Sequence, residues 1–377
     1  MTTKFKNALC NALFGLAALA SAAHDPRIQT ALTLQTPVNG ISTTPSGRLF
    51  VLFARVDGSK GAQVAEHLEN GTFAPYPNLE WNSYSEERDP ATHLIRTNAQ
   101  RIGPDGLLWM VDTGSPSFGA PVILPDGPKL VTVNLTTNCV QRVYSLGNVT
   151  LAKSLIDDIR FNPPSGMAYI TDAGEPAIIV LDLKSGHAVR VLEGDYSTRG
   201  APFPVSAEGQ LLHSSADPSF PFQYILADQL EVSPDLESFY FQPSNGGLSR
   251  IATADLDKAF YNASQASVLS KFVSRMALTP STGGTAIDAN GIIYLSDTDR
   301  QEIITIHPNG TWNTFLRDDR LLWVDAMWVG SDKKLYMPAA QLNRGSPFQK
   351  NGTVKIQKPL YVYTIDIGVG PPEMDHA

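Results

Sequence analysis

The stretch TNAQRIGPDGLLWMVDTG, residues 97–114, decides the fold of this chain. Its Pro-Asp-Gly run suits a tight turn, because proline presets φ, aspartate hydrogen-bonds nearby backbone and glycine reaches positive φ. The apolar run Leu107–Val111 follows this turn. A short apolar run between turn signals is typical of a strand that is buried on both faces. The stretch therefore predicts a β-hairpin, and a single hairpin does not bury its own surfaces.

The same hairpin recurs along the chain when its turn residue Gly106 is taken as the anchor. The six anchors are Gly47, Gly106, Gly166, Leu236, Gly291 and Lys333. Further strands are expected in the gaps, at residues 129–135, 177–183, 302–308 and 360–367. A hairpin followed by two more strands, and then by the next hairpin, is the pattern of a β-propeller. We predict an all-β fold, with residues 24–377 forming a single six-bladed β-propeller of four antiparallel strands per blade. A pair of β-sandwiches is the alternative, but it would not repeat one motif in this way.

The N-terminus predicts a secretory signal peptide over residues 1–23. Lys4 and Lys6 precede a small and apolar run at residues 8–20, and small residues follow before His24. A frayed amphipathic helix is the alternative. We expect the protein to be secreted or to enter the secretory pathway, which leaves Cys139 as its one mature cysteine. Six Asn-x-Ser/Thr sites are candidates for glycosylation: Asn70, Asn134, Asn148, Asn262, Asn309 and Asn351.

Composition and absent motifs exclude several classes of function. The formal net charge is −8, and no stripe of Lys and Arg is present to neutralise phosphates, so nucleic acid is not an expected partner. No apolar run of about 20 residues follows the N-terminal segment, so no membrane span is expected. The chain contains no GxSxG elbow, HExxH, CxxC or Walker loop, and no GxGxxG that opens a helix. Hydrolysis by a Ser-His-Asp triad and chemistry on a redox cofactor have no support in the sequence.

Polar residues recur eight positions before the anchors, where the first strand of each blade begins. These positions hold Asn39, Asn98, Asp158, Asp228, Gly283 and Asp325. First strands line the central channel of a propeller, so the pattern predicts a ring of carboxylates and amides at one mouth of the axis. Three interpretations remain open. The ring caps backbone groups, or Asp158, Asp228 and Asp325 bind Ca²⁺, or it anchors a small-molecule substrate with one of these aspartates as acid or base.

Other polar and aromatic residues are assigned by their positions relative to this ring. Asp112, Asp172 and Asp297 follow their anchors by six residues, and we interpret them as structural turn caps. An axial mouth with carboxylates and aromatic rings is typical of a small-molecule pocket. The candidate substrate-binding residues are Asn39, Asn98, Trp81, Tyr84, His93 and Trp323.

Several blocks of this chain, taken in order, resemble the major royal jelly and yellow protein family. They include APYPNLEW (74–81), RIGPDGLLWMVDTG (101–114) and DDIRFNPPSGMAYITDAGEPAIIVLDLKSG (157–186). Pro104 and Asp105 replace the family's usual cysteine context, which points to a fungal or bacterial-type branch. The resemblance implies a secreted six-bladed propeller. The chain is similar to fungal relatives of tropolone-sesquiterpenoid pathways, which look like pericyclases that join a quinone methide to a humulene-type alkene by hetero-Diels–Alder addition. A weaker similarity, NGI at 39–41, is to calcium-dependent gluconolactonase-like propellers.

These observations together lead us to expect an enzyme of secondary metabolism that acts on a small, apolar, oxygenated metabolite in the axial pocket. The resemblance favours a hetero-Diels–Alder cycloaddition without a cofactor, with Asp158, Asp228 and Asp325 as the catalytic residues. A non-catalytic binding protein for a small ligand is one alternative. A calcium-dependent lactonase-like hydrolase is the other.

Overall fold

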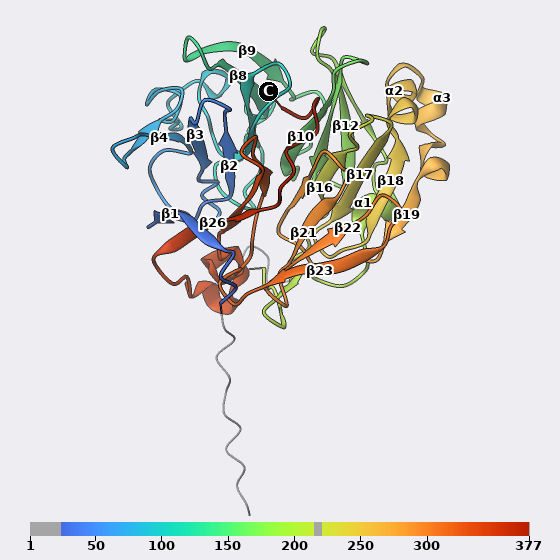
Figure 1. Ribbon diagram of the computed structural model, residues 1–377. Coiled ribbons are helices and arrows are strands. Elements are labelled where there is room, and N and C mark those ends of the chain that lie inside the picture. The colour runs from blue at the N-terminus through green and yellow to red at the C-terminus, as the bar shows by residue number, and fades with distance from the viewer. Residues whose placement is uncertain (1–23, 215–220, 377) are drawn as a thin grey trace, which may run out of the picture.

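The computed structural model describes residues 24–214 and 221–376 and has the predicted all-β architecture. Six antiparallel four-stranded sheets are arranged around a central axis as the blades of a propeller (Figure 1). The predicted signal peptide, residues 1–23, lies outside the described residues.

The first strand of each blade is innermost, and the later strands follow outward. Blades one to three consist of β2 (Gly40–Thr43), β3 (Leu49–Leu52), β4 (Val64–His67) and β5 (Phe73–Pro75); β6 (Thr97–Ile102), β7 (Leu107–Asp112), β8 (Lys129–Asn134) and β9 (Cys139–Ser145); and β10 (Ile156–Asn162), β11 (Met167–Asp172), β12 (Ala177–Asp182) and β13 (Ala188–Val191). Blades four to six consist of β16 (Ala227–Val232), β17 (Ser238–Pro243), β18 (Leu248–Ala252) and β19 (Ser274–Ala277); β20 (Thr285–Ile287), β21 (Ile293–Asp297), β22 (Glu302–Ile306) and β23 (Trp312–Arg317); and β24 (Trp328–Val329), β25 (Lys334–Ala339), β26 (Leu360–Asp366) and β1 (Gln29–Leu34).

The repeated turn is the same in every blade, because all six anchor residues have positive φ. The values run from 62° at Lys333 to 90° at Gly47, and Leu236 has 64°. Glycine adopts this conformation without a steric cost, whereas leucine and lysine pay about 1–2 kcal/mol. The four glycines at the anchors are therefore explained by backbone geometry, and Leu236 and Lys333 are confirmed as their equivalents.

Blade six is closed by the two ends of the described chain. Strand β1 pairs with β26 in antiparallel register, with Gln29 opposite Thr364 and Leu34 opposite Leu360. The sequence analysis predicts the strand at 360–367 but not the N-terminal strand that pairs with it. This pairing joins the first described strand to the last blade, so that the ring of blades is held shut by hydrogen bonds (Figure 1).

The predicted turn caps Asp112 and Asp172 lie at the ends of the second strands β7 and β11. They accept hydrogen bonds from the backbone just before the first strands, β6 and β10, of the same blades. Asp112 accepts the backbone N–H groups of Ile95 and Arg96 at 2.7 and 3.0 Å, and Lys129 Nζ lies 2.7 Å from the same carboxylate. Asp172 likewise accepts the N–H of Leu155 at 2.9 Å. Their structural role is confirmed.

Helices are few and short in the described part of the chain. They are α1 (Tyr196–Arg199), α2 (Thr253–Tyr261), α3 (Ala263–Ala266) and the 3₁₀ turns Pro90–Thr92, Leu269–Phe272, Leu342–Arg344, Ser346–Phe348 and Lys350–Gly352. A two-stranded hairpin, β14 (Ser206–Ala207) and β15 (Gln210–Leu211), lies between blades three and four in the sequence. Among the described residues, no helix has the length and apolar character needed to cross a bilayer.

Candidate functional site

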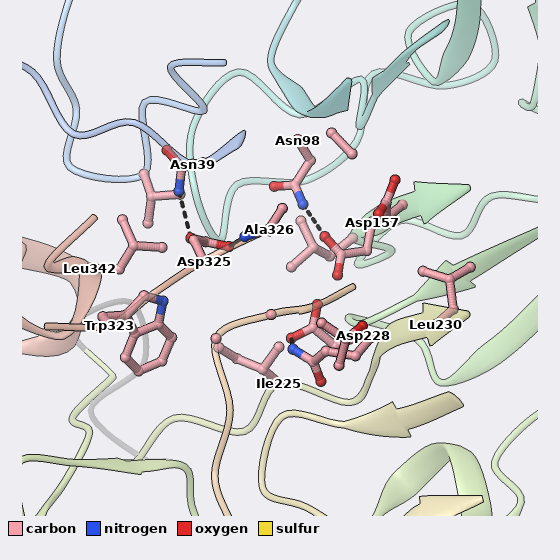
Figure 2. Close-up of a pocket in the computed structure, with 18 of the residues that line it drawn as sticks. Asn39, Asn98, Asp157, Ile225, Asp228, Leu230, Trp323, Asp325, Ala326 and Leu342 are labelled. Atoms are coloured by element: carbon pink, nitrogen blue, oxygen red, sulfur yellow. Dashed lines mark hydrogen bonds between the residues drawn. The ribbon is translucent and has the colours of Figure 1, made fainter. Parts of the chain in front are cut away.

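A pocket lies on the axis, at the end of the propeller where the first strands begin. All six blades contribute to its lining, and the cavity has a volume of about 80 Å³ (Figure 2). Its polar residues include Asn39, Asn98, Asp157, Asp228 and Asp325. Its apolar walls are formed by Val56, Phe118, Leu155, Ile225, Leu230, Trp323, Leu342 and Phe348. Partly exposed carboxyl groups are thus set among apolar walls.

Asp325 precedes the short strand β24 and is fixed by two hydrogen bonds. Its Oδ2 accepts from Asn39 Nδ2 at 2.9 Å, and its Oδ1 accepts from the backbone N–H of Ala326 at 2.9 Å. Burial raises the pKa of Asp325 to about 8; the donation from Asn39 opposes this shift, and the negative charge of Asp228 adds to it. Asp325 is therefore largely protonated at neutral pH and is able to donate a hydrogen bond.

Asp228 lies in a β-bulge at the start of β16, between Ala227 and Gln229. A bulged residue is unpaired in the ladder and its side chain is redirected, here into the pocket. Gln229 Nε2 donates to its carboxylate at 2.7 Å, and the Ser244 hydroxyl also donates to it. Burial raises the pKa of Asp228 to about 7 in spite of these two bonds. Asp228 and Asp325 therefore act as a coupled pair of acids near neutral pH.

Blade three places Asp157, rather than Asp158, at the position of Asn98 and Asp228. The turn of blade three is one residue longer than that of blade two, since four residues separate the paired Asn162 and Met167, whereas in blade two the N–H of Gly103 bonds the carbonyl of Leu107 across three residues. A count of eight residues from the anchor therefore falls one residue too far along the strand. Asn98 Nδ2 donates to the Asp157 carboxylate (Figure 2).

Asp158 also lines the pocket, but its carboxylate is engaged in an ion pair. Its Oδ2 lies 2.5 Å from Arg160 Nη1, and the same guanidinium binds Glu231 with two further bonds of 2.9 and 3.0 Å. Arg160 is buried beneath the pocket by these partners. The carboxylate of Asp158 is thus committed to arginine, while those of Asp228 and Asp325 are not.

The two amides of the ring face the carboxylates with their N–H groups. Asn39 Oδ1 accepts the backbone N–H of Ala54 at 3.1 Å, which directs Nδ2 to Asp325. Asn98 Oδ1 faces the guanidinium of Arg96 at 3.3 Å, which directs Nδ2 to Asp157. Both amide oxygens are thus occupied, and neither amide presents an oxygen to the pocket.

The predicted Ca²⁺ site would need six to eight oxygen ligands, including amide oxygens and waters, and it stays a prediction. Within the two described ranges, the one group of three His, Cys, Asp or Glu ligand atoms within 4.8 Å of one another is that of His24, Asp318 and Asp319. These three residues lie outside the axial pocket. Asp158, Asp228 and Asp325 therefore do not form a preformed cage for a cation.

Trp323 places an unused hydrogen-bond donor in the pocket. Its side chain is buried, and among the described residues its Nε1 has no partner within hydrogen-bond distance; it faces the carboxyl of Asp325, whose pKa this N–H lowers (Figure 2). Its ring stacks on Phe348 with centroids 6.2 Å apart, and Phe348 packs edge-on against Phe118 at 5.1 Å. An unpaired buried N–H group is costly, so this donor indicates a ligand acceptor at this point of the pocket.

Gly283 leaves the ring of polar side chains open in blade five for a steric reason. A Cβ at this position would lie 2.5 Å from the Val324 carbonyl oxygen and 3.0 Å from Trp323 Nε1. The missing side chain of Gly283 thus makes room for the indole of Trp323.

Trp81, Tyr84 and His93 are not among the residues that line the axial pocket. Trp81 packs against the core of blade one, and His93 is buried with Nδ1 2.9 Å from the carbonyl oxygen of Asp89. Apart from Trp323, the apolar wall residues escaped the sequence analysis, among them Phe118 in the loop after β7, and Leu342 and Phe348 in the 3₁₀ turns after β25. Only their apolar character marks them, and it does not distinguish them from the core.

Comparison with solved structures shows propellers of the same architecture. The luciferin-regenerating enzyme superposes with a TM-score of 0.53 and 13% identity, over 93% of this chain and 98% of that chain. A gluconolactonase of Xanthomonas campestris gives 0.52 and 11%, over 90% and 88% of the two chains. The calcium-binding protein regucalcin of Agrobacterium tumefaciens gives 0.52 and 12%, over 91% and 95%. At these identities the likeness shows the fold alone.

Comparison of the sequence with curated proteins gives no match. The family model described as "Major royal jelly protein", however, matches residues 99–347, which covers blades two to five and part of blade six. The matched segment begins one residue after Asn98. It contains Ala99 and the carboxyl residues Asp157, Asp228 and Asp325 of the pocket. This chain belongs to the major royal jelly protein family.

Proposed function

We propose that the axial pocket binds the oxygen-bearing end of a small, largely apolar metabolite and activates its carbonyl or hydroxyl oxygen by proton donation from Asp325. The observation that carries this proposal is the pair of half-buried carboxyl groups, Asp228 and Asp325, set in apolar walls beside the indole N–H of Trp323. Two donors that converge on one point are suited to a single acceptor oxygen.

The protonation state supports the role of an acid. At neutral pH, burial keeps a proton on Asp325, whose pKa is raised to about 8. General acids work best when their pKa lies near the pH of the reaction. Asp228, with a pKa raised to about 7, supports this role because its negative charge favours retention of the proton on Asp325 until a ligand oxygen accepts the hydrogen bond. Asn39 holds the Asp325 carboxyl in place throughout, because its own oxygen is fixed by Ala54.

The reaction that fits this arrangement, and the branch of the family that the sequence resembles, is a hetero-Diels–Alder coupling of a quinone methide with a terpene alkene. A cycloaddition requires two partners held face to face, exclusion of water and one hydrogen bond to the carbonyl. The cavity of about 80 Å³ is roughly half the size of the apolar cavity of about 150 Å³ that binds benzene in an engineered protein. The reacting oxygen would thus occupy the cavity itself, and the alkene would lie in its mouth against Phe118 and Phe348.

Binding is tested with tropone, a neutral seven-membered ring ketone, by isothermal titration calorimetry. Loss of one hydrogen bond to the ligand weakens binding by about 1 kcal/mol, or roughly fivefold. We expect this loss for Asp325→Ala, which removes the donor, and, separately, for Trp323→Phe, which keeps the stacking on Phe348. Asp366→Ala, at the exposed end of β26, is the matched control. Equal affinity in the wild type and both pocket variants would remove the proposal.

Turnover is tested by generating an o-quinone methide in the presence of humulene, with and without the protein. An altered product ratio or stereochemistry, lost in Asp325→Asn, supports the coupling enzyme. Binding of tropone with an unchanged product ratio supports the non-catalytic ligand-binding protein. The lactonase-like hydrolase predicts lactone hydrolysis that stops in the presence of a chelator, and activity in chelator would exclude it.

A further inference from the structure

The segment at residues 370–376 enters the central channel from the face opposite to the pocket. Gly370 begins there, where its carbonyl oxygen accepts the N–H of Ala289 at 3.0 Å in the first turn of blade five. Asp375 and His376 then contact innermost strands, β6 through Arg101 and β24 through Trp328. The side chains of Asp375 and His376 are only 13% and 2% exposed, which shows that the channel encloses them.

Two residues of inner strands hold the end of this segment. Both carboxylate oxygens of Asp375 accept from Arg101 Nη2, at 3.1 and 2.9 Å. The imidazole of His376 stacks on Trp328 with centroids 3.8 Å apart and an interplanar angle of 26°. Arg101 is near the end of β6, and Asn98, at its beginning, lines the pocket. The backbone positions of Asn98 and Arg101 are three residues, about 10 Å, apart along the strand. The guanidinium of Arg101 reaches to 3.8 Å from Asp158 of the pocket lining, so Asp375 binds next to the inner end of the pocket.

Arg101 depends on this contact for its charge balance. It is buried, and its Nε has no hydrogen-bond partner among residues 24–214 and 221–376. The other carboxylate near it is that of Asp158, at 3.8 Å, and Asp158 is already paired with Arg160 at 2.5 Å. Without Asp375, the guanidinium of Arg101 would be a buried cation beside a second buried cation, which is strongly unfavourable.

We infer that Arg101 forms a carboxylate-binding site in the channel, that Asp375 fills this site, and that residues 370–376 thereby close the face of the propeller opposite to the pocket. The axial cavity then has a single mouth, on the side of Asn39 and Asp325. Any small carboxylate of the size of the aspartate side chain fits the chemistry of the site once Asp375 is removed. The inference does not depend on the proposed function, since none of its residues is assigned to the ligand.

The test is removal of the Asp375 side chain followed by addition of acetate. We expect Asp375→Ala to raise amide hydrogen exchange in β6 and around Trp328 by about tenfold or more, the effect of losing a buried charge-assisted bond. Sodium acetate should reverse this increase with a saturable dose response, whereas sodium chloride at equal ionic strength should not. Glu373→Ala is the matched control, because Glu373 belongs to the same segment and is exposed.

Two results would overturn the inference. One is unchanged exchange in Asp375→Ala, or an increase that acetate reverses no better than chloride. The other is an equal increase in the outer strands β9 and β13, which would show a general loss of stability rather than opening of the channel. Should Asp375→Ala fail to fold, the isosteric Asp375→Asn is measured in the same way, and its exchange in β6 must exceed that of the wild type.

Discussion

Replacement of Asp325 by asparagine should change how the stability of the propeller depends on pH. The folded protein keeps a proton on this carboxyl, because burial raises its pKa from 3.8 to about 8. The unfolded chain loses that proton near pH 4. A group with a raised pKa contributes stability that is fully present below the unfolded pKa and is lost as pH rises through the folded pKa. Wild-type protein should therefore become less stable between about pH 5 and pH 8.

The size of this effect follows from the shift. Each pH unit at which the folded state holds one extra proton changes the free energy of unfolding by about 1.4 kcal/mol. Over the interval of about three units, Asp325 accounts for about 4 kcal/mol, and Asp228 adds less than its own full share because the two groups are coupled. Asp325→Asn removes the larger part of this dependence. It also loses one of the two accepted hydrogen bonds, from Asn39 or Ala326, which lowers stability at every pH by about 1 kcal/mol.

Urea unfolding at a series of pH values measures the dependence directly, and the slope against pH matters more than the absolute stability. The wild-type curve should fall by a few kcal/mol toward alkaline pH, and the Asp325→Asn curve should be clearly flatter. Asp366→Asn, which changes an exposed carboxyl, should follow the wild type. Parallel curves for the wild type and Asp325→Asn would refute the conclusion that Asp325 is protonated in the folded protein.

Three further predictions concern the stability of the propeller and the passage of the protein through the secretory pathway. Lys129→Met should cost about 3–5 kcal/mol in urea unfolding, because it leaves Asp112 as a buried charge without its partner at 2.7 Å; a loss below about 1 kcal/mol would show that the pair is dispensable. Lys333→Gly should raise the free energy of unfolding and Gly166→Ala should lower it, each by up to about 1 kcal/mol, since both anchors have positive φ. No atom lies within 4 Å of a Cβ at Gly166, so the added methyl group does not clash. Changes of the same sign in the two variants, measured by urea unfolding, would contradict this reasoning. We also propose that the protein is a secreted glycoprotein, so peptide mapping of material from a eukaryotic host should find glycans at the exposed Asn70 and Asn309, and unmodified peptides at both would argue against it.

The sequence was sufficient for the fold because one hairpin, with one special backbone position, repeats in every blade. Even Leu236 and Lys333, which lack the glycine signal, were found from the strands around them, and their positive φ confirms the assignment. The closing strand β1 was missed because its partner β26 is more than 300 residues away, and no local pattern links them.

The site was only partly predictable, because it depends on features that spacing does not record. A turn longer by one residue moved the ring position from Asp158 to Asp157. The orientation of Asn39, which turns its N–H toward Asp325, is set by the backbone of Ala54. Phe118 and Phe348 reach the pocket from loops, and their roles are decided by tertiary packing. The polar residue types on the axis could thus be predicted from the sequence. Their protonation and their hydrogen bonds could be found only from the structure.

The central claim, that neutral carboxyl groups line an apolar pocket, is tested most directly by ¹³C NMR titration of the protein labelled at its aspartate carboxyls. We predict two carboxyl resonances that titrate with midpoints near 7 and 8, far above ordinary aspartates. The resonance with the higher midpoint should vanish in Asp325→Asn. In Asp228→Asn the remaining midpoint should move down, because the charge that raises it has been removed. A titration in which every aspartate has its midpoint below about 5 would contradict the account.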